Sequence, residues 1–429
     1  MWKKMSAVTL WKRVLIALFL GGIVGLIAHY NGGADFITTW LKPFGDGFVR
    51  LIKMLIIPLI VTTLVSGVIA MGDPKRLGSL GAKTLALYIG TTFFAVSLGL
   101  IFGTIFQPGL GIDLSNVDQT SRDMLAARVS GDTPSLGQRL LAIIPVNPVE
   151  AMAKGDILAT IFFSILIGVG IIAVGEPANA LKDFFHSAEE VVMKITLFIM
   201  ELAPFGVFAL IAWVIADLGL GIIPAMGKLA IALYLACLCQ IVFIYGMVII
   251  RGLLKLPMIR FFSGVLDAQG VAFSTASSSA TLPVTISCAQ RHLGIDESVA
   301  GSVLPLGATI NMDGTAIYLG LIALFTAQAF GIDLALADYM MIALTATLAS
   351  VGAAGIPSAS LFLAFTVLSV FGVSLDQYTL IVAFILPFDR LLDMMRTLTN
   401  VTGDAAVAST VAKWEGQLDE DVFRTKTGK

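Results

Sequence analysis

The sequence predicts an all-α protein that crosses a membrane many times. Of its 429 residues, 57% are hydrophobic and only 13% are charged, and the mean hydropathy is +0.92. Soluble domains typically carry about 25% charged residues, so this chain is far too apolar to be one of them. Its successive apolar runs suit helices that cross a bilayer, which takes about 20 residues each. We therefore expect a polytopic membrane protein.

Composition also excludes other classes of protein. A net charge of −2 provides no basic surface for nucleic acid, so no nucleic-acid partner is expected. The three cysteines lie in apolar stretches, and neither they nor the three histidines have the spacing of a metal site. We therefore expect no prosthetic group.

Short polar segments divide the N-terminal half into apolar runs. Basic residues precede the first run and follow the second, which places the N-terminus in the cytoplasm by the positive-inside rule. The fifth run is too long for one perpendicular crossing, so tilt or a cytoplasmic extension is expected. The six runs span residues 14–30, 45–72, 82–106, 151–174, 180–217 and 226–251, and the polar connection 107–139 follows the third.

Small and polar residues interrupt the apolar runs of the C-terminal half. Segments 274–283 and 349–360 each separate two half-length apolar pieces, which are too short to cross alone. Each segment is predicted to form a re-entrant hairpin, the first with its tip at 277–279, where a cytoplasmic loop is the alternative. A third interruption, at 307–315, is expected to break a helix and turn main-chain carbonyls toward a cavity.

The last apolar run carries a dense polar stripe. Its members recur at steps of four, three, one, three and four, which stacks them on one face of a helix. A solvated amphipathic helix is the alternative, but in a membrane protein ionisable groups at this depth usually face a site. The stripe consists of Asp389, Asp393, Arg396, Thr397, Asn400 and Asp404.

Two hairpins, a broken helix and a striped helix together indicate a transporter. Corresponding interruptions in two repeated parts point to a transporter's binding site. Carbonyls at unwound helix suit a hard cation such as sodium, and Arg396 suits a carboxylate. A channel would favour a ring of one ligand type. An enzyme using Asp389 and Asp393 as an acid/base pair would need a nucleophile, metal set or histidine beside them.

Four segments of the C-terminal half resemble the signatures of one family. They are residues 277–283, 311–315, 355–357 and 389–404, and Tyr88, Thr91 and Thr92 match the family spacing in the third run. In these residues the chain is similar to the dicarboxylate/amino acid:cation symporters, the glutamate and aspartate transporter family, in its prokaryotic type. The resemblance implies eight transmembrane helices plus two re-entrant hairpins with inverted repeats, a homotrimer and an elevator-type mechanism.

The same resemblance implies a division of the chain into a static scaffold and a sliding transport domain. The expected parts are scaffold helices 1–2 (residues 1–81), transport helix 3 (82–107), an extramembrane loop (108–138), scaffold helices 4–5 (139–217), the remaining transport domain (218–415) and a cytoplasmic tail (416–429).

The resemblance also implies roles for individual residues. Arg396 would bind the side-chain carboxylate of the substrate, Asp393 its amino group and Asn400 its main carboxylate. The full substrate set is Ser277, Ser278, Thr315, Ile356, Ser360, Asp393, Arg396, Thr397 and Asn400. The coupling-ion set is Tyr88, Thr91, Thr92, Gly307, Thr309, Asn311, Asp313, Ser350, Val351, Ala353, Asn400 and Asp404.

The chain departs from the family at two positions. Ala276 and Met394 stand where archaeal and animal relatives, respectively, carry arginine. Asp393 therefore lacks a cationic neighbour that the family usually supplies.

The expected function is sodium-coupled symport of aspartate or glutamate across the cell inner (plasma) membrane, with both termini cytoplasmic and no enzymatic activity. The alternative within the class is a C4-dicarboxylate symporter, coupled to sodium or protons. An unpaired Asp393 beside two substrate carboxylates argues against it. An anion channel of the same fold and a membrane enzyme are the alternatives from other classes.

Overall fold

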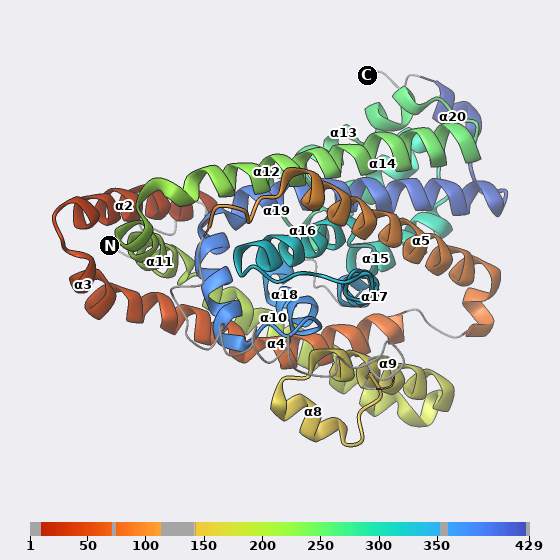
Figure 1. The fold of residues 1–429 in the computed structure, drawn as a ribbon. Helices are drawn as coiled ribbons and strands as arrows, with labels where there is room; N and C mark the ends of the chain where they lie inside the picture. The colour runs from red at the N-terminus through yellow and green to blue at the C-terminus, as the bar shows by residue number, and fades with distance from the viewer. Residues whose placement is uncertain (1–9, 71–73, 113–140, 142, 352–358, 426–429) are drawn as a thin grey trace, which may run out of the picture.

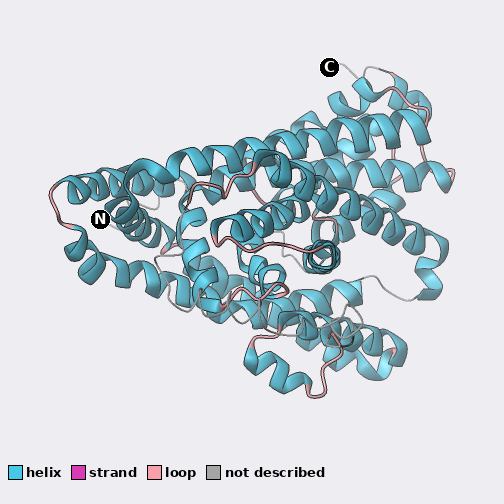
Figure 2. Cartoon of the chain, in the orientation of Figure 1, coloured by secondary structure: helices cyan, strands magenta, loops and turns pink. Residues whose placement is uncertain are grey.

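The structure is a computed structural model that describes residues 10–70, 74–112, 141, 143–351 and 359–425 (Figure 1). Within these residues helices are joined by loops (Figure 2), and one isolated β-bridge pairs Ile295 with Leu418. Five of the described helices are long and apolar enough to cross a membrane, or six if the bent pair α10–α11 counts as one span. The predicted all-α, multi-pass architecture is confirmed, whereas the number of eight spans stays a prediction.

The helices of the N-terminal part include two π-helical stretches, η1 and η4. They are α2 (Leu10–Tyr30), α3 (Ala34–Phe36), η1 (Ile37–Leu41), α4 (Lys42–Ala70), α5 (Pro74–Phe106), α8 (Pro148–Lys154), α9 (Ile157–Val174), η2 (Glu176–Ala178), α10 (Asn179–Met200), α11 (Ala203–Leu218), η3 (Gly219–Gly221), α12 (Ile222–Cys239) and η4 (Gln240–Leu253).

The helices of the C-terminal part include the predicted half-length pieces. They are α13 (Met258–Thr275), α14 (Ser278–Leu293), α15 (Glu297–Ile310), α16 (Asp313–Ala329), α17 (Leu336–Val351), α18 (Ala359–Ser369), α19 (Leu375–Trp414) and α20 (Glu420–Arg424).

The helices pack in two groups. Helices α2, α4, α9, α10 and α11 contact one another, and α5, α12 and α13–α19 form the other group around α16 and α19 (Figure 1). Across the boundary, the Lys53 ammonium on α4 donates to the Thr379 hydroxyl on α19. The division into scaffold and transport parts, and movement of one against the other, stay predictions.

Glycines allow α5 to approach α16 closely. A Cβ on Gly99 would lie 2.3 Å from the carbonyl oxygen of Ile317, and one on Gly103 would lie 2.9 Å from Leu324 Cδ1. Small residues at four-residue spacing let helix backbones meet in a membrane, where packing rather than water expulsion drives association. The contact fixes Tyr88, Thr91 and Thr92 of α5 beside the break before α16.

Two of the predicted interruptions lie among the described residues. The turn between α13 and α14 uses Ala276 in the left-handed region (φ 51°) and Ser277 as the cap that accepts from Ala280 N. The turn residues Ala276 and Ser277 overlap the predicted tip only at Ser277, because Ser278 already begins α14. Asn311 and Met312 separate α15 from α16, as predicted. The second hairpin stays a prediction, because residues 352–358, between α17 and α18, lie outside the described part.

The long fifth run is divided by a bend of 50° between α10 and α11. This bend accounts for the length that exceeds one perpendicular crossing. By contrast, α19 continues through Pro387 for 40 residues, and it begins at a capping box formed by Ser374 and Gln377. One continuous helix therefore carries the whole polar stripe.

The segment after α19 packs against the loop between α14 and α15. Asp419 N donates to Gly294 O at 2.8 Å, and Asp296 N donates to Gln417 O at 3.1 Å. The Phe423 side chain is buried. Hydrogen bonds from Lys413 and Arg424 lower the pKa of Glu420. The described part of the expected tail is thus an ordered extension of the C-terminal group.

Candidate functional site

The polar stripe of α19 faces the protein interior. All six members of the stripe are buried, with exposed fractions between 0 and 4%. Helices α13, α14, α15 and α16 pack against α19 and cover it. The alternative of a solvated amphipathic helix is therefore wrong.

One cluster on this stripe is built around a guanidinium. Arg396 Nη1 lies 3.0 Å from Asp389 Oδ1, and Arg396 Nη2 lies 2.9 Å from Asp393 Oδ1. The guanidinium carbon lies 3.8 Å from the ring centroid of Tyr318, whose hydroxyl donates to Asp389 Oδ1 at 2.7 Å. We call these four residues the arginine cluster. Its buried positive charge is thus held by two carboxylates and one aromatic face.

Several predicted substrate residues meet beside the arginine cluster. The hydroxyls of Thr315 and Ser360 lie 3.0 Å apart, and Asn400 Oδ1 accepts from Gly314 N at 2.7 Å. A Cβ on Gly314 would lie 2.3 Å from the carbonyl oxygen of Arg396, so only glycine allows this approach. Ser277, Ser278 and Thr397 are also buried. Ile356 lies outside the described residues.

A second cluster lies at the break between α15 and α16. Thr92 Oγ1 donates to Asp313 Oδ1 at 2.7 Å, and Asn311 Nδ2 donates to Asp404 Oδ1 at 2.9 Å. Thr91 Oγ1 donates to Asn311 Oδ1 at 3.4 Å. We call Thr91, Thr92, Asn311, Asp313 and Asp404 the two-carboxylate cluster. The structure thus brings five of the twelve predicted coupling-ion residues together.

Tyr88 and Gly307 border this cluster. The hydroxyl of Tyr88 donates to Val303 O at 3.0 Å. A Cβ on Gly307 would lie 2.5 Å from both that hydroxyl and Asp404 Oδ1. The absence of a side chain at Gly307 therefore leaves room for the two groups that face it.

Nothing cationic reaches the two carboxylates of this cluster in the described part of the chain. Asp313 and Asp404 are 0% and 2% exposed, and the ion pairs found among the described residues include neither. Their hydrogen-bond donors are neutral hydroxyls and amides. A buried carboxylate without a counter-charge is costly, so the arrangement suits a cation or a proton.

The remaining predicted ion ligands belong to a separate set. Thr309 Oγ1 donates to Leu306 O at 3.0 Å, and the buried Ser350 donates to Thr347 O at 2.8 Å. Val351 ends α17, and Ala353 lies outside the described residues. A shared ion site for this set stays a prediction.

Sequence reasoning missed four residues at the two clusters. Tyr318 stacks on Arg396, and Gln240 and Tyr245 donate to Asp313. Arg390 Nη2 donates to Ser274 O at 3.2 Å and Thr275 O at 3.0 Å, beside Ala276. A glutamine inside the apolar run 226–251 was a usable signal, because polar groups at membrane depth usually have a partner.

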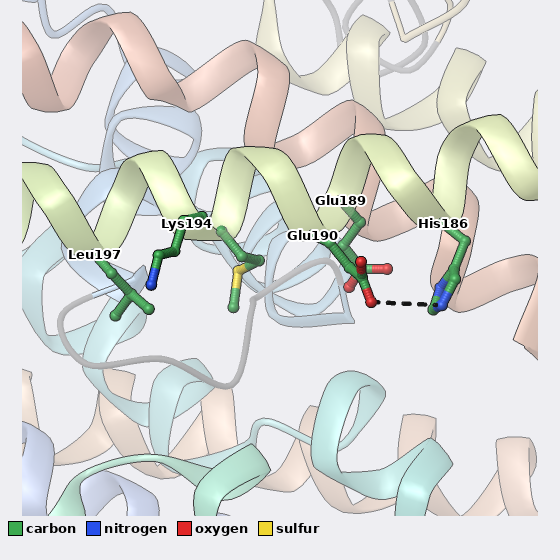
Figure 3. Close-up of a pocket in the computed structure, with 6 residues that line it drawn as sticks. His186, Glu189, Glu190, Lys194 and Leu197 are labelled. Atoms are coloured by element: carbon green, nitrogen blue, oxygen red, sulfur yellow. Dashed lines mark ion pairs between the residues drawn. The ribbon is translucent and has the colours of Figure 1, made fainter.

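The hollow along α10 is separate from both clusters. Figure 3 shows His186, Glu189, Glu190 and Lys194 along this one helix. His186 Nε2 lies 3.8 Å from Glu190 Oε1, and both side chains are about three-quarters exposed. An exposed pair one helical turn apart contributes only about 0–1 kcal/mol. We assign this hollow no part in the site.

The family follows from comparison with known proteins. The sodium:dicarboxylate symporter family model matches residues 10–414, which include every described residue of both clusters. The chain belongs to the sodium:dicarboxylate symporter family. This membership confirms the family indicated by the sequence segments.

The relatives of this chain are named for different substrates. The chain is 35% identical over 413 residues to the proton/sodium-glutamate symport protein of Geobacillus stearothermophilus, covering 95% of each chain. It is 35% identical over 416 residues to the proton/glutamate-aspartate symporter of Escherichia coli (strain K12), covering 95% of this chain and 93% of the relative. It is also 35% identical over 416 residues to the C4-dicarboxylate transport protein of Rhodospirillum rubrum, covering 96% and 90%. All three are named as symport or transport proteins, and none is named as an enzyme.

Proposed function

We propose that this protein is a sodium-coupled symporter of aspartate or glutamate. The observation that carries the proposal is the two-carboxylate cluster, where two buried carboxylates have only neutral hydrogen-bond donors among the described residues. Sodium, as a transported ion, would supply the missing positive charge. Carboxylate, amide, hydroxyl and main-chain oxygens would bind it. The proton is the alternative coupling ion.

The arginine cluster favours an amino acid with two carboxylates. Arg396 holds Asp393 at 2.9 Å and Asp389 at 3.0 Å. A substrate carboxylate that binds the guanidinium would displace Asp393, and the ammonium group of the same substrate would then pair with Asp393. Asp389 would keep its contacts with Arg396 and Tyr318. A C4-dicarboxylate has no ammonium group and would leave Asp393 buried without a partner.

The neighbouring residues complete the proposed binding site. Asn400 lies on the same side of α19 as Arg396, one turn further along, and would donate its amide to the main carboxylate. Thr315 and Ser360, whose hydroxyls already face each other, would close on the side-chain carboxylate. We place the chain in the plasma membrane as a homotrimer with both termini cytoplasmic. The C-terminal helix group would move as an elevator against the other.

Binding measurements on the purified protein test the substrate and the ion together. L-aspartate, L-glutamate, succinate and L-serine are each titrated in sodium, potassium or choline chloride. We expect the two acidic amino acids to bind tightly in sodium only. By linkage, bound substrate must raise sodium affinity by the same factor. Equal aspartate binding in sodium and choline would contradict sodium coupling, and tighter binding of succinate would favour the dicarboxylate alternative.

Asp393→Asn tests the proposed ammonium contact. The variant keeps the shape of the side chain but loses its charge, and a charged hydrogen bond contributes about 1.5–3 kcal/mol. We therefore expect aspartate affinity to fall at least about tenfold. Sodium binding by the empty protein should remain detectable. Unchanged aspartate affinity would remove Asp393 from the binding site.

A further inference from the structure

Two side chains of η4 reach the two-carboxylate cluster from a helix that supplies none of its predicted members. Gln240 Nε2 and Tyr245 OH both donate to Asp313 Oδ2, at 3.2 Å and 2.5 Å. Both side chains are completely buried. The segment η4 thus holds Asp313 from the side opposite to Thr92, which donates to the other oxygen, Oδ1.

The π-helical geometry of η4 explains how two residues five positions apart reach one oxygen. An α-helix has 3.6 residues per turn, which turns residues i and i+5 well away from each other. The wider i→i+5 winding of a π-helix brings them to nearly the same face. Gln240 and Tyr245 stand at this separation, at the start of η4. Such stretches are rare and often occur at functional sites.

Gln240 also contributes an unused oxygen to this region. Its Nε2 donates both to Asp313 Oδ2 and to the main-chain oxygen of Thr91, each at 3.2 Å. Because the amide nitrogen faces two acceptors, Oε1 points away from them. Oε1 is buried and has no hydrogen-bond partner among the described residues.

The hydroxyl of Tyr245 is held tightly in place. A Cβ on Gly403 of α19 would lie only 2.6 Å from this hydroxyl, and Asn311 Nδ2 approaches the same glycine. The hydroxyl is therefore confined between Asp313 and the α19 backbone. With Oδ2 fixed by η4 and Oδ1 by Thr92, the Asp313 carboxylate has one orientation.

We propose that Gln240 and Tyr245 are positioning residues of the sodium site. They fix Asp313 Oδ2 so that Oδ1 remains with Thr92, one of the predicted ion ligands. This inference rests on the proposed sodium coupling. A purely structural role would stabilise the fold equally with and without sodium, whereas a positioning role changes the sodium dependence itself.

The test measures the Tm of the purified, substrate-free protein as sodium chloride replaces choline chloride at constant ionic strength. Tyr245→Phe removes one hydrogen bond to a charged group, so the sodium concentration for half-maximal stabilisation should rise about tenfold. Tyr378→Phe is the matched control, because Tyr378 is equally buried and its hydroxyl donates to Leu361 O at 2.8 Å. The control should lower the Tm without shifting this half-maximal sodium concentration, which we call the sodium midpoint.

Gln240→Leu removes the amide that donates to Asp313 Oδ2. We expect it to raise the sodium midpoint as well. Sodium midpoints for both variants equal to that of Tyr378→Phe would overturn the positioning role while leaving sodium coupling intact. If the unmodified protein gains no stability from sodium over choline, the proposed coupling fails first, and this inference fails with it.

Discussion

The two polar clusters each include residues of α19, but they compensate for buried charge in opposite ways. In the arginine cluster, Arg396 is paired with Asp389 and Asp393 and stacked on Tyr318. In the two-carboxylate cluster, only neutral groups among the described residues donate to Asp313 and Asp404. The arginine cluster thus has its own counter-charges, one of which the proposed substrate would replace. The two-carboxylate cluster has no cation among the described residues, which is why we propose a transported ion there.

Three consecutive residues at the start of α16 connect the two-carboxylate cluster with the proposed substrate site. Asp313 belongs to the two-carboxylate cluster, Gly314 N donates to Asn400, and the Thr315 hydroxyl faces Ser360. An ion that orders the start of α16 therefore orders two groups of the proposed substrate site. Ordering of a shared element by both ligands is a physical basis for coupling between their sites.

The largest expected effect comes from removing the charge of Arg396. Arg396→Thr leaves Asp389 and Asp393 buried without their partner, and breaking a buried ion pair costs about 3–5 kcal/mol. We expect aspartate affinity to fall more than about a hundredfold, as measured by calorimetry in saturating sodium.

Arg396→Lys is the matched variant for this prediction. It keeps the charge but loses the planar fork that contacts both carboxylates, so partial loss of affinity is expected. If Arg396→Thr bound aspartate as tightly as the unmodified protein, the arginine cluster would not be the substrate site.

An intermediate effect is expected where a methyl group enters the two-carboxylate cluster. Gly307→Ala would place a Cβ 2.5 Å from Asp404 Oδ1 and from the Tyr88 hydroxyl. Overpacking of this kind costs about 1–3 kcal/mol, so the sodium midpoint of thermal stabilisation should rise about tenfold.

Gly301→Ala is the control on the same helix, because a Cβ there would meet nothing within 4 Å. It should leave the sodium midpoint unchanged, and an alanine in place of glycine adds up to about 1 kcal/mol of helix stability. Equal sodium midpoints for the two variants would show that Gly307 does not border the ion site.

The sequence alone predicted the elements whose pattern is local. Hydropathy predicted the apolar helices, and glycine with asparagine predicted the break before Asp313. The spacing of Asp389, Asp393 and Arg396 predicted one helix face, and the structure places these side chains in contact. Such features depend on neighbours in the chain, which is why their period reveals them.

Contacts between distant segments could not be predicted in the same way. Tyr318 reaches Arg396 only because α16 packs against α19, and no period relates the two residues. Gln240 and Tyr245 share a face only in a π-helix, whereas α-helical periodicity would separate them. The orientation of Arg390 toward the α13 carbonyls likewise depends on tertiary packing.

The smallest expected effect concerns Arg390, which acts on the arginine cluster from outside. Its guanidinium donates to the carbonyls of Ser274 and Thr275, the last two residues of α13, and so ties the turn of the first hairpin to α19. Arg390 lies one helical turn before Met394, and its acceptors directly precede Ala276. A cation at a helix C-terminus contributes about 0.3–1 kcal/mol.

Arg390→Gln should therefore weaken aspartate binding about two- to fivefold while leaving the sodium midpoint of the empty protein unchanged. Arg260→Gln, which removes the same charge from the first turn of α13, is the control and should leave aspartate affinity unaltered. Calorimetry in sodium measures the affinity, and the Tm titration measures the sodium midpoint. A sodium midpoint that shifts as much as the aspartate affinity would contradict this expectation. It would mean that Arg390 acts on both clusters through the turn between α13 and α14.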